Sequence, residues 1–322
     1  MYSTDGYRAL RASSAAIRRE DRGVLVVSGA DRSSWLQGLV TNDVTALRPG
    51  ESQYAAYLTP QGRMISDMRI VALRDRMLLE VAGGLAESLR AKLDSLLFAE
   101  DAQIADMSGT LAVIDVHGPS SADVVERARG LLDMTAIDVI RDDVYRVPGQ
   151  TFFVEREKAQ LLVQALREAG ALETTLETLD VIRIEAGVPQ FLVDMDEHTI
   201  PLEAGIEQRA ISFTKGCYVG QEVIVRVTHR GHGRVAKKLV GMRFEKDAAP
   251  RPRDVIVAAE REIGQLTSAT WSPVLEGHIA LGSVHRDFTD PGTSVQVRTT
   301  SGIATATVTQ LPFVKGDAAR TS

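Results

Sequence analysis

The chain has 322 residues, with 37 Lys and Arg against 43 Asp and Glu, and a single cysteine. A net charge of −6 excludes a protein whose whole surface is built to hold nucleic acid, because such domains are usually basic. One cysteine excludes an intrachain disulfide and any four-cysteine metal site made by this chain alone. The apolar runs are far shorter than the roughly 20 residues that cross a bilayer, and the N-terminus lacks the apolar core of a secretory signal. We therefore expect a cytoplasmic protein with no membrane contact and no metal site of its own.

In the first half of the chain, β-branched runs predict strands, and apolar residues at helical spacing predict helices. A second strand–glycine–helix cycle starts near residue 108 and repeats the opening of the first, with Gly118 in the place of Gly29. Because several strands separate the helices, we expect an α+β layer structure with antiparallel sheets and not a doubly wound fold. The expected strands are Val24–Ser28, Gln53–Leu58, Met64–Leu73, Arg76–Val81, Leu111–Val116 and Thr151–Val154, and the expected helices lie at the N-terminus, after Asp31, Gly84 and Ser120, and around Leu161.

The pattern changes after residue 235. Helical periodicity disappears, and short runs rich in Val, Thr and Ile alternate with Gly and Pro. Regularly spaced short strands predict a small antiparallel β-barrel or sandwich of about 80 residues. We therefore divide the chain into an α+β module over 1–235 and a small β domain over 236–322. The expected strands are Leu239–Phe244, Asp254–Ala258, Glu262–Ser268, His278–Val284, Ser294–Thr299 and Ala304–Leu311.

The only cysteine lies in the loop Lys215–Glu222, which two glycines punctuate. The alternating valines that follow predict a strand over Glu222–Thr228. In an extended loop Lys215 and Cys217 share a face, and an ammonium so close favours the thiolate. A lone cysteine is often a small buried apolar residue, but Cys217 lies outside any apolar run. Cys217 and Lys215 are therefore candidate catalytic residues.

Two charged stretches surround this loop in the sequence. Between Arg226 and Lys238 lie five basic side chains, Arg230 among them, and two histidines without an acid. This stretch is suited to a phosphate, a polycarboxylate tail or an RNA segment, and a solvated loop that protects a strand edge explains it equally well. Upstream, Asp194–Glu203 holds four carboxylates but lacks the glycine of an EF-hand loop. A carboxylate there can accept two parallel hydrogen bonds from an amino-pyrimidinone edge such as that of a pterin, and a surface loop is the alternative.

A further acid, Asp67, lies in the middle of an expected strand. It shares a face with Ile65, Arg69 and Val71. Asp67 is therefore either a site carboxylate or the partner of Arg69.

The loop Lys215–Glu222, K-G-C-Y-x-G-Q-E, resembles the signature of the YgfZ group, which are folate-binding relatives of the glycine-cleavage T-protein, an aminomethyltransferase. The resemblance covers nearly the whole chain, and Asp67 lies at the place of an aspartate that T-proteins carry. Two positions depart from T-proteins: Phe191-Leu192 stands for a tyrosine–glycine pair, and Ser66-Asp67 for paired aspartates. The other resembling segments are Gly29–Val44, Gly62–Met68, Arg183–Gly187, Asp194–Glu197, Pro201–Gly205, Ile263–Pro273 and Pro312-Phe313.

The resemblance implies two intertwined ferredoxin-like subdomains around a folate pocket and a C-terminal small antiparallel β-barrel. Its cofactor would be tetrahydrofolate or a one-carbon derivative. Asp67 and Glu197 become the site acid and the pterin contact, Phe191 a residue of the pocket, and Arg226 and Arg230 the dock of the glutamate tail.

In the YgfZ group the Lys-Gly-Cys loop serves the assembly or repair of iron–sulfur clusters in a subset of enzymes, including tRNA-modifying ones. We therefore expect a tetrahydrofolate-binding accessory protein that meets iron–sulfur enzymes or their assembly proteins through Cys217, and the sequence leaves open whether it also turns over a substrate. The alternative is an aminomethyl or other one-carbon transferase that uses tetrahydrofolate. A third hypothesis is a weak RNA contact through Arg226–Lys238.

Overall fold

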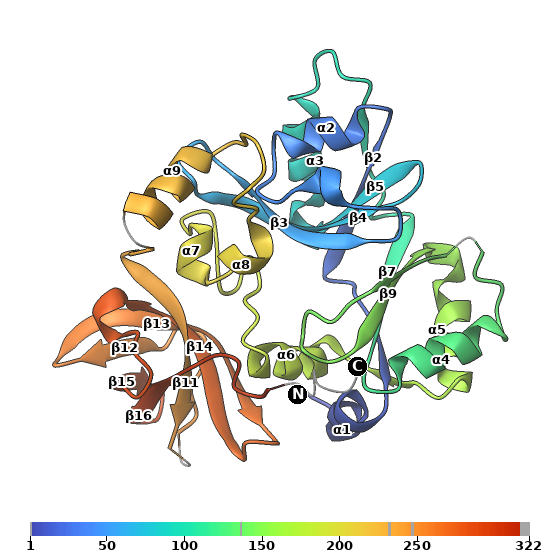
Figure 1. Ribbon diagram of the computed structural model, residues 1–322. Helices are drawn as coiled ribbons and strands as arrows, with labels where there is room; N and C mark the ends of the chain where they lie inside the picture. The colour runs from blue at the N-terminus through green and yellow to red at the C-terminus, as the bar shows by residue number, and fades with distance from the viewer. Residues whose placement is uncertain (1, 136, 231–232, 246–247, 316–322) are drawn as a thin grey trace. The chain divides into compact units, whose positions relative to one another are not determined.

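The computed structural model describes residues 2–135, 137–230, 233–245 and 248–315, with the backbone alone at Arg230. The chain forms two compact units (Figure 1). Unit 1 contains residues 1–59, 65–179 and 209–219, and unit 2 contains residues 60–64, 180–208 and 220–322. The segment that carries Cys217 therefore belongs to unit 1, although it lies far along the chain from the rest of that unit.

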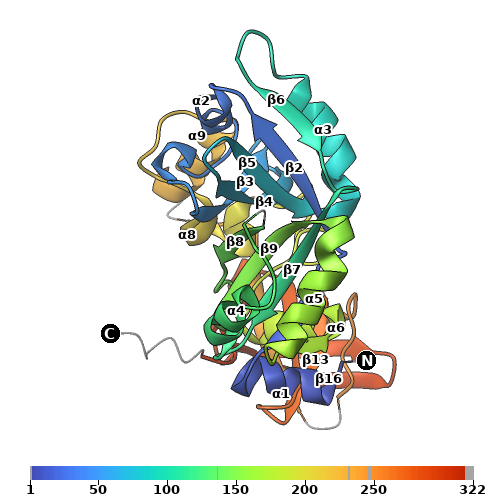
Figure 2. The same cartoon turned by 90° about the vertical axis from the view of Figure 1, so that its right-hand side faces the viewer.

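The first sheet of unit 1 has the strand order β3-β4-β5-β2-β6. Helix α3 lies along β2 and β6 (Figure 2), and the face it covers buries Leu25, Leu36, Leu79 and Leu89. Burying that apolar face is the main source of stability for such a layer. The elements are β2 (Arg22–Ser28), α2 (Arg32–Gln37), β3 (Ser52–Leu58), β4 (Met64–Ala72), β5 (Arg76–Ala82), α3 (Ala86–Asp94) and β6 (Gln103–Asp106), with 3₁₀ turns at Val44–Ala46 and Gly83–Leu85.

The second sheet has the order β10-β1-β7-β9-β8. Strand β1 precedes the whole first sheet in the chain, yet it pairs antiparallel with β7 and parallel with β10. The two subdomains are therefore intertwined, as the resemblance implies. The elements are α1 (Thr4–Ala12), β1 (Ala15–Arg18), β7 (Leu111–His117), α4 (Ser121–Arg129), β8 (Asp138–Arg141), β9 (Gly149–Glu155), a 3₁₀ turn (Arg156–Lys158), α5 (Ala159–Glu168) and β10 (Leu172–Thr174).

The faces of the two sheets that carry no helix pack on each other inside unit 1. One part of this contact is apolar and joins β2, β4 and β5 to β7, β8 and β9. Because side chains alternate along a strand, charged residues two or four positions from these apolar ones enter the same layer. The apolar residues are Val24, Val71, Leu78, Val113, Ile140 and Phe153, and the charged ones are Arg22, Asp67, Arg69, Glu80 and Asp115.

Unit 2 contains a closed barrel with the strand order β11-β14-β13-β12-β15-β16, in which β11 pairs with β16. Its interior is lined by small and branched apolar residues, including Val240, Ile256 and Val297. The strands are β11 (Lys237–Phe244), β12 (Val255–Ala258), β13 (Arg261–Ser272), β14 (Gly277–His285), β15 (Ser294–Thr299) and β16 (Gly302–Thr309), with a 3₁₀ turn at Arg286–Phe288.

Short helices connect these layers: α6 (Leu176–Glu185), α7 (Pro201–Ala204), α8 (Glu207–Ala210) and α9 (Gln221–Val225), and α9 continues as a π-helix over Arg226–Arg230. Within the described ranges, no helix combines the length and the apolar composition that crossing a membrane requires.

The structure confirms the α+β class, the expected strands of both halves and the barrel. It contradicts the strand expected over Glu222–Thr228, where α9 and the π-helix lie. Gly220, with φ at 84°, turns the chain into this helix, and the Thr228 hydroxyl bonds the Ile224 carbonyl one helical turn back. Ile224 is the fully buried residue of this segment, whereas Val225 is exposed. The alternating valines therefore do not mark a half-buried strand.

Candidate functional site

The first candidate group is the carboxylate of Asp67, which alternation along β4 turns into the layer between the two sheets. The side chain is 5% exposed, and the Tyr54 hydroxyl on the neighbouring strand β3 donates a hydrogen bond of 2.8 Å to its Oδ2. The other oxygen, Oδ1, is buried and has no hydrogen-bond partner among the described residues. Burial raises the pKa of Asp67, although Arg22 and the Tyr54 hydrogen bond act against it. A buried carboxylate with one unused oxygen fits an N–H donor on a ligand, such as a reduced pterin.

The alternative that Asp67 is the partner of Arg69 is wrong. Arg69 points to other carboxylates: its Nε donates to Glu80 at 2.7 Å and its Nη1 to Asp142 at 2.8 Å. Arg22 donates to the second oxygen of Glu80 at 2.9 Å. Glu80 therefore has a guanidinium at each oxygen, and Arg69 has no donor directed at Asp67.

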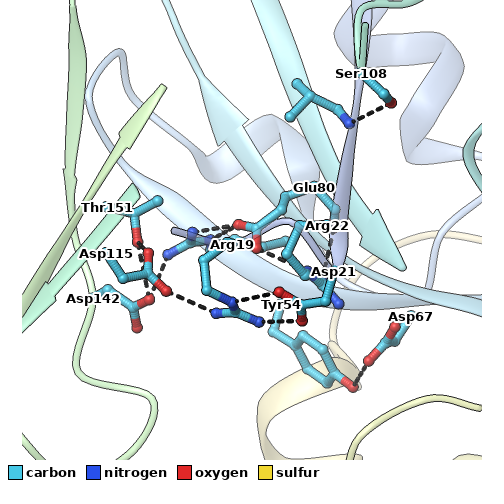
Figure 3. A network of polar contacts seen from close by, with 12 residues as sticks. Arg19, Asp21, Arg22, Tyr54, Asp67, Glu80, Ser108, Asp115, Asp142 and Thr151 are labelled. Carbon is cyan, nitrogen blue, oxygen red and sulfur yellow. Dashed lines mark hydrogen bonds and ion pairs between the residues drawn. The ribbon is translucent and has the colours of Figure 1, made fainter. Parts of the chain in front are cut away.

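These contacts continue into a buried ion network (Figure 3). Arg19 makes two hydrogen bonds of 2.9 Å to Asp21 and one of 2.7 Å to Asp115, whose other oxygen accepts from Thr151 at 2.6 Å. Burial alone would raise the pKa values of Asp115 and Asp142, but Arg19 and Arg69, together with the neighbouring His117, outweigh it and hold both values low. The network joins strands of both sheets, which is a structural role, and the sequence analysis did not identify it.

The loop of the candidate thiol is held by Lys215. Its ammonium group donates to the carbonyl oxygens of Gln37, Val40 and Asn42 at 2.7, 2.8 and 2.8 Å. These three bonds use all three N–H donors, and burial lowers the pKa of Lys215 to about 8. Cys217 is an exposed free thiol. Lys215 is thus turned inward while Cys217 is turned outward, and the two side chains do not share the face that an extended loop would give them.

In unit 2 the acidic stretch is a folded loop. Asp194 is buried, and it accepts bonds of 2.6 Å from Arg183 and 2.7 Å from Ser268, which tie the loop to α6 and β13. Phe191 is also buried, at 3% exposure, and forms a β-bridge with Met195. Glu197 follows these buried residues in the loop and directly precedes His198. Its side chain is 71% exposed, so its carboxylate is accessible to a ligand.

The basic stretch begins on α9. Arg226 is exposed and borders a pocket of about 390 Å³ whose lining also includes Glu222, Val223, Val225 and His229. Helical geometry brings Glu222 and Arg226 to one face, since they are four residues apart. Gly231 and His232 lie outside the described residues, and only the backbone of Arg230 is described. The RNA contact and the glutamate-tail dock stay predictions.

Two residues of the Asp67 site were not found from the sequence. Tyr54 carried a signal: counted outward from the hairpin turn at Pro60 and Gln61, Tyr54 falls opposite Asp67. Nothing in the sequence around Arg209 indicates its place in the site. Its guanidinium lies 4.9 Å from the centre of the Tyr54 ring only because the segment 209–219 returns to unit 1.

Comparison with known proteins gives matches along most of the chain. Residues 2–141 match the GCVT N-terminal domain, and residues 237–315 match the glycine cleavage T-protein C-terminal barrel domain. An aminomethyltransferase of Halothermothrix orenii is 26% identical over 96% of this chain and 90% of its own length. One from a Geobacillus strain is 27% identical over 96% of this chain and 89% of its own length.

Among solved structures, the glycine cleavage system aminomethyltransferase T of Bartonella henselae matches with a TM-score of 0.87 at 20% identity, over 97% of this chain and 89% of that one. That likeness establishes the fold. Since both T-protein domains are present in their expected order, the chain belongs to the glycine-cleavage T-protein/aminomethyltransferase superfamily.

Proposed function

We propose that this protein binds tetrahydrofolate and transfers a one-carbon unit to or from it, in the manner of an aminomethyltransferase. The observation that carries the proposal is Asp67, a buried carboxylate with a raised pKa, one oxygen fixed by Tyr54 and the other unbonded. The superfamily and the aminomethyltransferases that resemble the chain over nearly its whole length support the same cofactor. This is the alternative function of the sequence analysis, and the comparisons favour it over the accessory role.

When bound, tetrahydrofolate supplies the amine nitrogens that take up the one-carbon unit. Asp67 accepts an N–H from such a nitrogen on Oδ1, and the Tyr54 hydroxyl keeps the carboxylate plane fixed while it does so. A carboxyl whose pKa burial raises above its ordinary value is better suited than an exposed one to take up that proton and return it.

We assign the pterin edge to Glu197, because its carboxylate is exposed, its one ion-pair contact, to His198 Nε2 at 3.8 Å, is equally exposed, and a carboxylate can accept two parallel N–H donors. Phe191, which is buried and forms a β-bridge with Met195 of the same loop, is assigned to the pocket. Arg226, and Arg230 with it, are assigned to the carboxylates of the glutamate tail.

The test is a tetrahydrofolate titration of the parent, Asp67→Asn and Glu197→Gln, with the exposed Asp123→Asn as a matched control. Both site variants should bind at least about tenfold more weakly, because each loses one charge-assisted hydrogen bond, while the control binds as the parent does. Formation of methylene-tetrahydrofolate from an aminomethyl-lipoyl donor should fall in the same order. A parent protein that binds no tetrahydrofolate would refute the proposal.

The exposed thiol favours a second candidate function. Cys217 is held at the surface on a loop whose lysine is locked onto three carbonyls, which suits contact with a partner protein. This candidate is the accessory role toward iron–sulfur enzymes, with folate bound separately. In a deletion strain Cys217→Ala should then lose the activity of iron–sulfur enzymes such as tRNA-modifying ones, yet bind tetrahydrofolate normally. If Cys217→Ala restores those enzyme activities fully, the accessory role is excluded.

A further inference from the structure

Arg209 reaches the Asp67 site from a distant part of the chain. It lies in α8, and the backbone on either side of it is fastened to the segment after α2. Asn42 Nδ2 donates to the Arg209 carbonyl at 3.0 Å, and the Thr41 hydroxyl donates to the next carbonyl, that of Ala210, at 2.5 Å. The same Asn42 amide also donates to the carbonyl of Tyr54 at 2.9 Å. Arg209 and Tyr54 are therefore fixed to each other through the backbone as well as through their side chains.

The side chains of Arg209, Tyr54 and Asp67 contact one another in that order. The Arg209 guanidinium lies 4.9 Å from the centre of the Tyr54 ring, a cation–π contact, and the Tyr54 hydroxyl donates to Asp67. A cation on the ring face draws electron density from the phenol and strengthens its O–H as a donor. The contact also holds the ring in the orientation that aims the hydroxyl at Asp67.

Four groups from four elements face Asp67: Arg22 of β2, Tyr54 of β3, Glu80 of β5 and Arg209 of α8. Arg22 forms an ion pair with Glu80 at 2.9 Å, yet its charge still acts against the burial that raises the pKa of Asp67. Arg209 takes part in none of the ion pairs formed by residues 2–135, 137–230, 233–245 and 248–315. Arg209 is therefore a second positive charge at this carboxylate, and it acts together with Arg22 against the burial that raises the pKa of Asp67.

We propose that Arg209 is a positioning residue of the folate site: it fixes the Tyr54 phenol and, together with Arg22, keeps Asp67 ionised and able to accept an N–H. The ligand in this inference rests on the proposed function, whereas the effect of Arg209 on Asp67 is a property of the protein alone. The two parts are therefore measured separately.

The first measurement needs no ligand. The full-length protein is labelled with ¹³C at the aspartate carboxyl carbons, the Asp67 signal is assigned by its loss in Asp67→Asn, and its titration midpoint is followed in Arg209→Met and Arg209→Lys. We expect the midpoint to rise by about half a pH unit or more in Arg209→Met, which removes a cation close to a buried acid. Arg209→Lys should stay closer to the parent, and Arg243→Met, which removes an exposed charge from β11, should not move it.

The second measurement is tetrahydrofolate affinity against pH. As pH falls, tetrahydrofolate affinity should decrease where Asp67 becomes protonated, which is the acid limb of the binding curve. In Arg209→Met this limb should lie at higher pH than in the parent, by the same amount as the Asp67 titration midpoint. At pH values above the limb, the affinity should stay near that of the parent. A residue that only stabilised the fold would change the unfolding temperature without moving this limb.

An unchanged Asp67 midpoint in a folded Arg209→Met protein overturns the inference. If neither Arg209→Met nor Arg209→Gln folds, Arg209 is a structural residue and the inference is likewise overturned. If the parent binds no tetrahydrofolate while the carboxyl midpoint shifts as expected, the proposed function fails and the positioning of Asp67 by Arg209 stands.

Discussion

Unit 1 contains two aspartates on neighbouring sheets that are buried to nearly the same degree and yet differ in chemistry. Asp115 on β7 is fully buried and Asp67 on β4 is 5% exposed. Arg19 and Thr151 fill both oxygens of Asp115, and its pKa is held low. Tyr54 fills one oxygen of Asp67, and its pKa is raised. Burial acts on both in the same direction, so the partners decide the outcome.

This difference is the reason why we propose a structural role for Asp115 and a functional one for Asp67. A buried charge that the protein itself satisfies holds elements together, whereas one left with an unused oxygen in a folded protein indicates a ligand that completes it. Removing each acid in turn therefore tests the distinction directly.

The largest effect is expected for Asp115→Asn. The amide leaves the buried Arg19 guanidinium without one of its two charged partners, and breaking a buried pair in this way costs about 3 kcal/mol. The free energy of unfolding in urea measures it. The matched control is Asp94→Asn, which removes a partly exposed pair with Arg90 and should cost roughly 0.5 kcal/mol or less. If Asp115→Asn lowers the free energy of unfolding no more than the control does, the structural role of Asp115 is contradicted.

The pH dependence of stability should follow from the same network. Asp115 and Asp142 have pKa values lowered in the folded state, so the unfolded chain binds protons first as pH falls. Their contribution is complete above the ordinary carboxyl pKa of about 4 and is lost progressively below it. Unfolding temperatures measured between neutral pH and the lowest pH at which the protein stays folded should drop steeply in this acidic range. The unfolding temperature of Asp115→Asn should drop less steeply with falling pH than that of the parent. If the two curves run parallel, the assignment is contradicted.

Asp67→Asn should have a small effect of opposite sign on stability. Because the pKa of Asp67 is raised on folding, its ionised form destabilises the folded protein at neutral pH. The neutral amide should leave the free energy of unfolding unchanged or raise it by up to about 1 kcal/mol, while tetrahydrofolate binding weakens by at least about tenfold. Urea unfolding and ligand titration of the same preparation measure both. A destabilisation as large as that of Asp115→Asn would make Asp67 a structural residue.

The smallest effect concerns the thiol. All three donors of Lys215 are bound to carbonyl oxygens, so Lys215→Met should change the rate of iodoacetamide alkylation of Cys217 at pH 7.5 by no more than about twofold. Lys237→Met, at an exposed lysine of β11, is the control. A tenfold slower reaction in Lys215→Met alone would restore the sequence-based hypothesis that this lysine activates the cysteine.

Much of the fold could be predicted from local patterns. Period-two runs such as Met64–Ala72 became strands because one face of each is buried by helices, and the regularly spaced runs after residue 236 closed into a barrel. The pattern failed at Glu222–Thr228, where spacing alone cannot distinguish an exposed valine on a short helix from an inward-facing valine on a strand.

The candidate site was only partly predictable. Asp67 was found because an acid among apolar residues is conspicuous, and the hairpin count would have added Tyr54. The partners of Asp115 and the position of Arg209 depend on which distant strands and loops meet, and no local pattern contains that information. For the same reason Lys215 was assigned to its neighbour Cys217 and not to the carbonyl oxygens of residues 37–42 that it actually binds.

The place of β1 in its sheet also sets an order of assembly. During synthesis from the N-terminus, the first sheet has all its strands once residue 106 is available, because it draws on nothing later in the chain. Strand β1 emerges before that sheet but pairs with β7 at Ile114–His117 and with β10 at Leu172–Thr174. One hydrogen-bonding edge of the earliest strand thus stays unpaired until Thr174 is available, and long-range pairings of this kind close slowly. The interval before Thr174 is synthesised is when the nascent chain most needs protection from pairing with other chains.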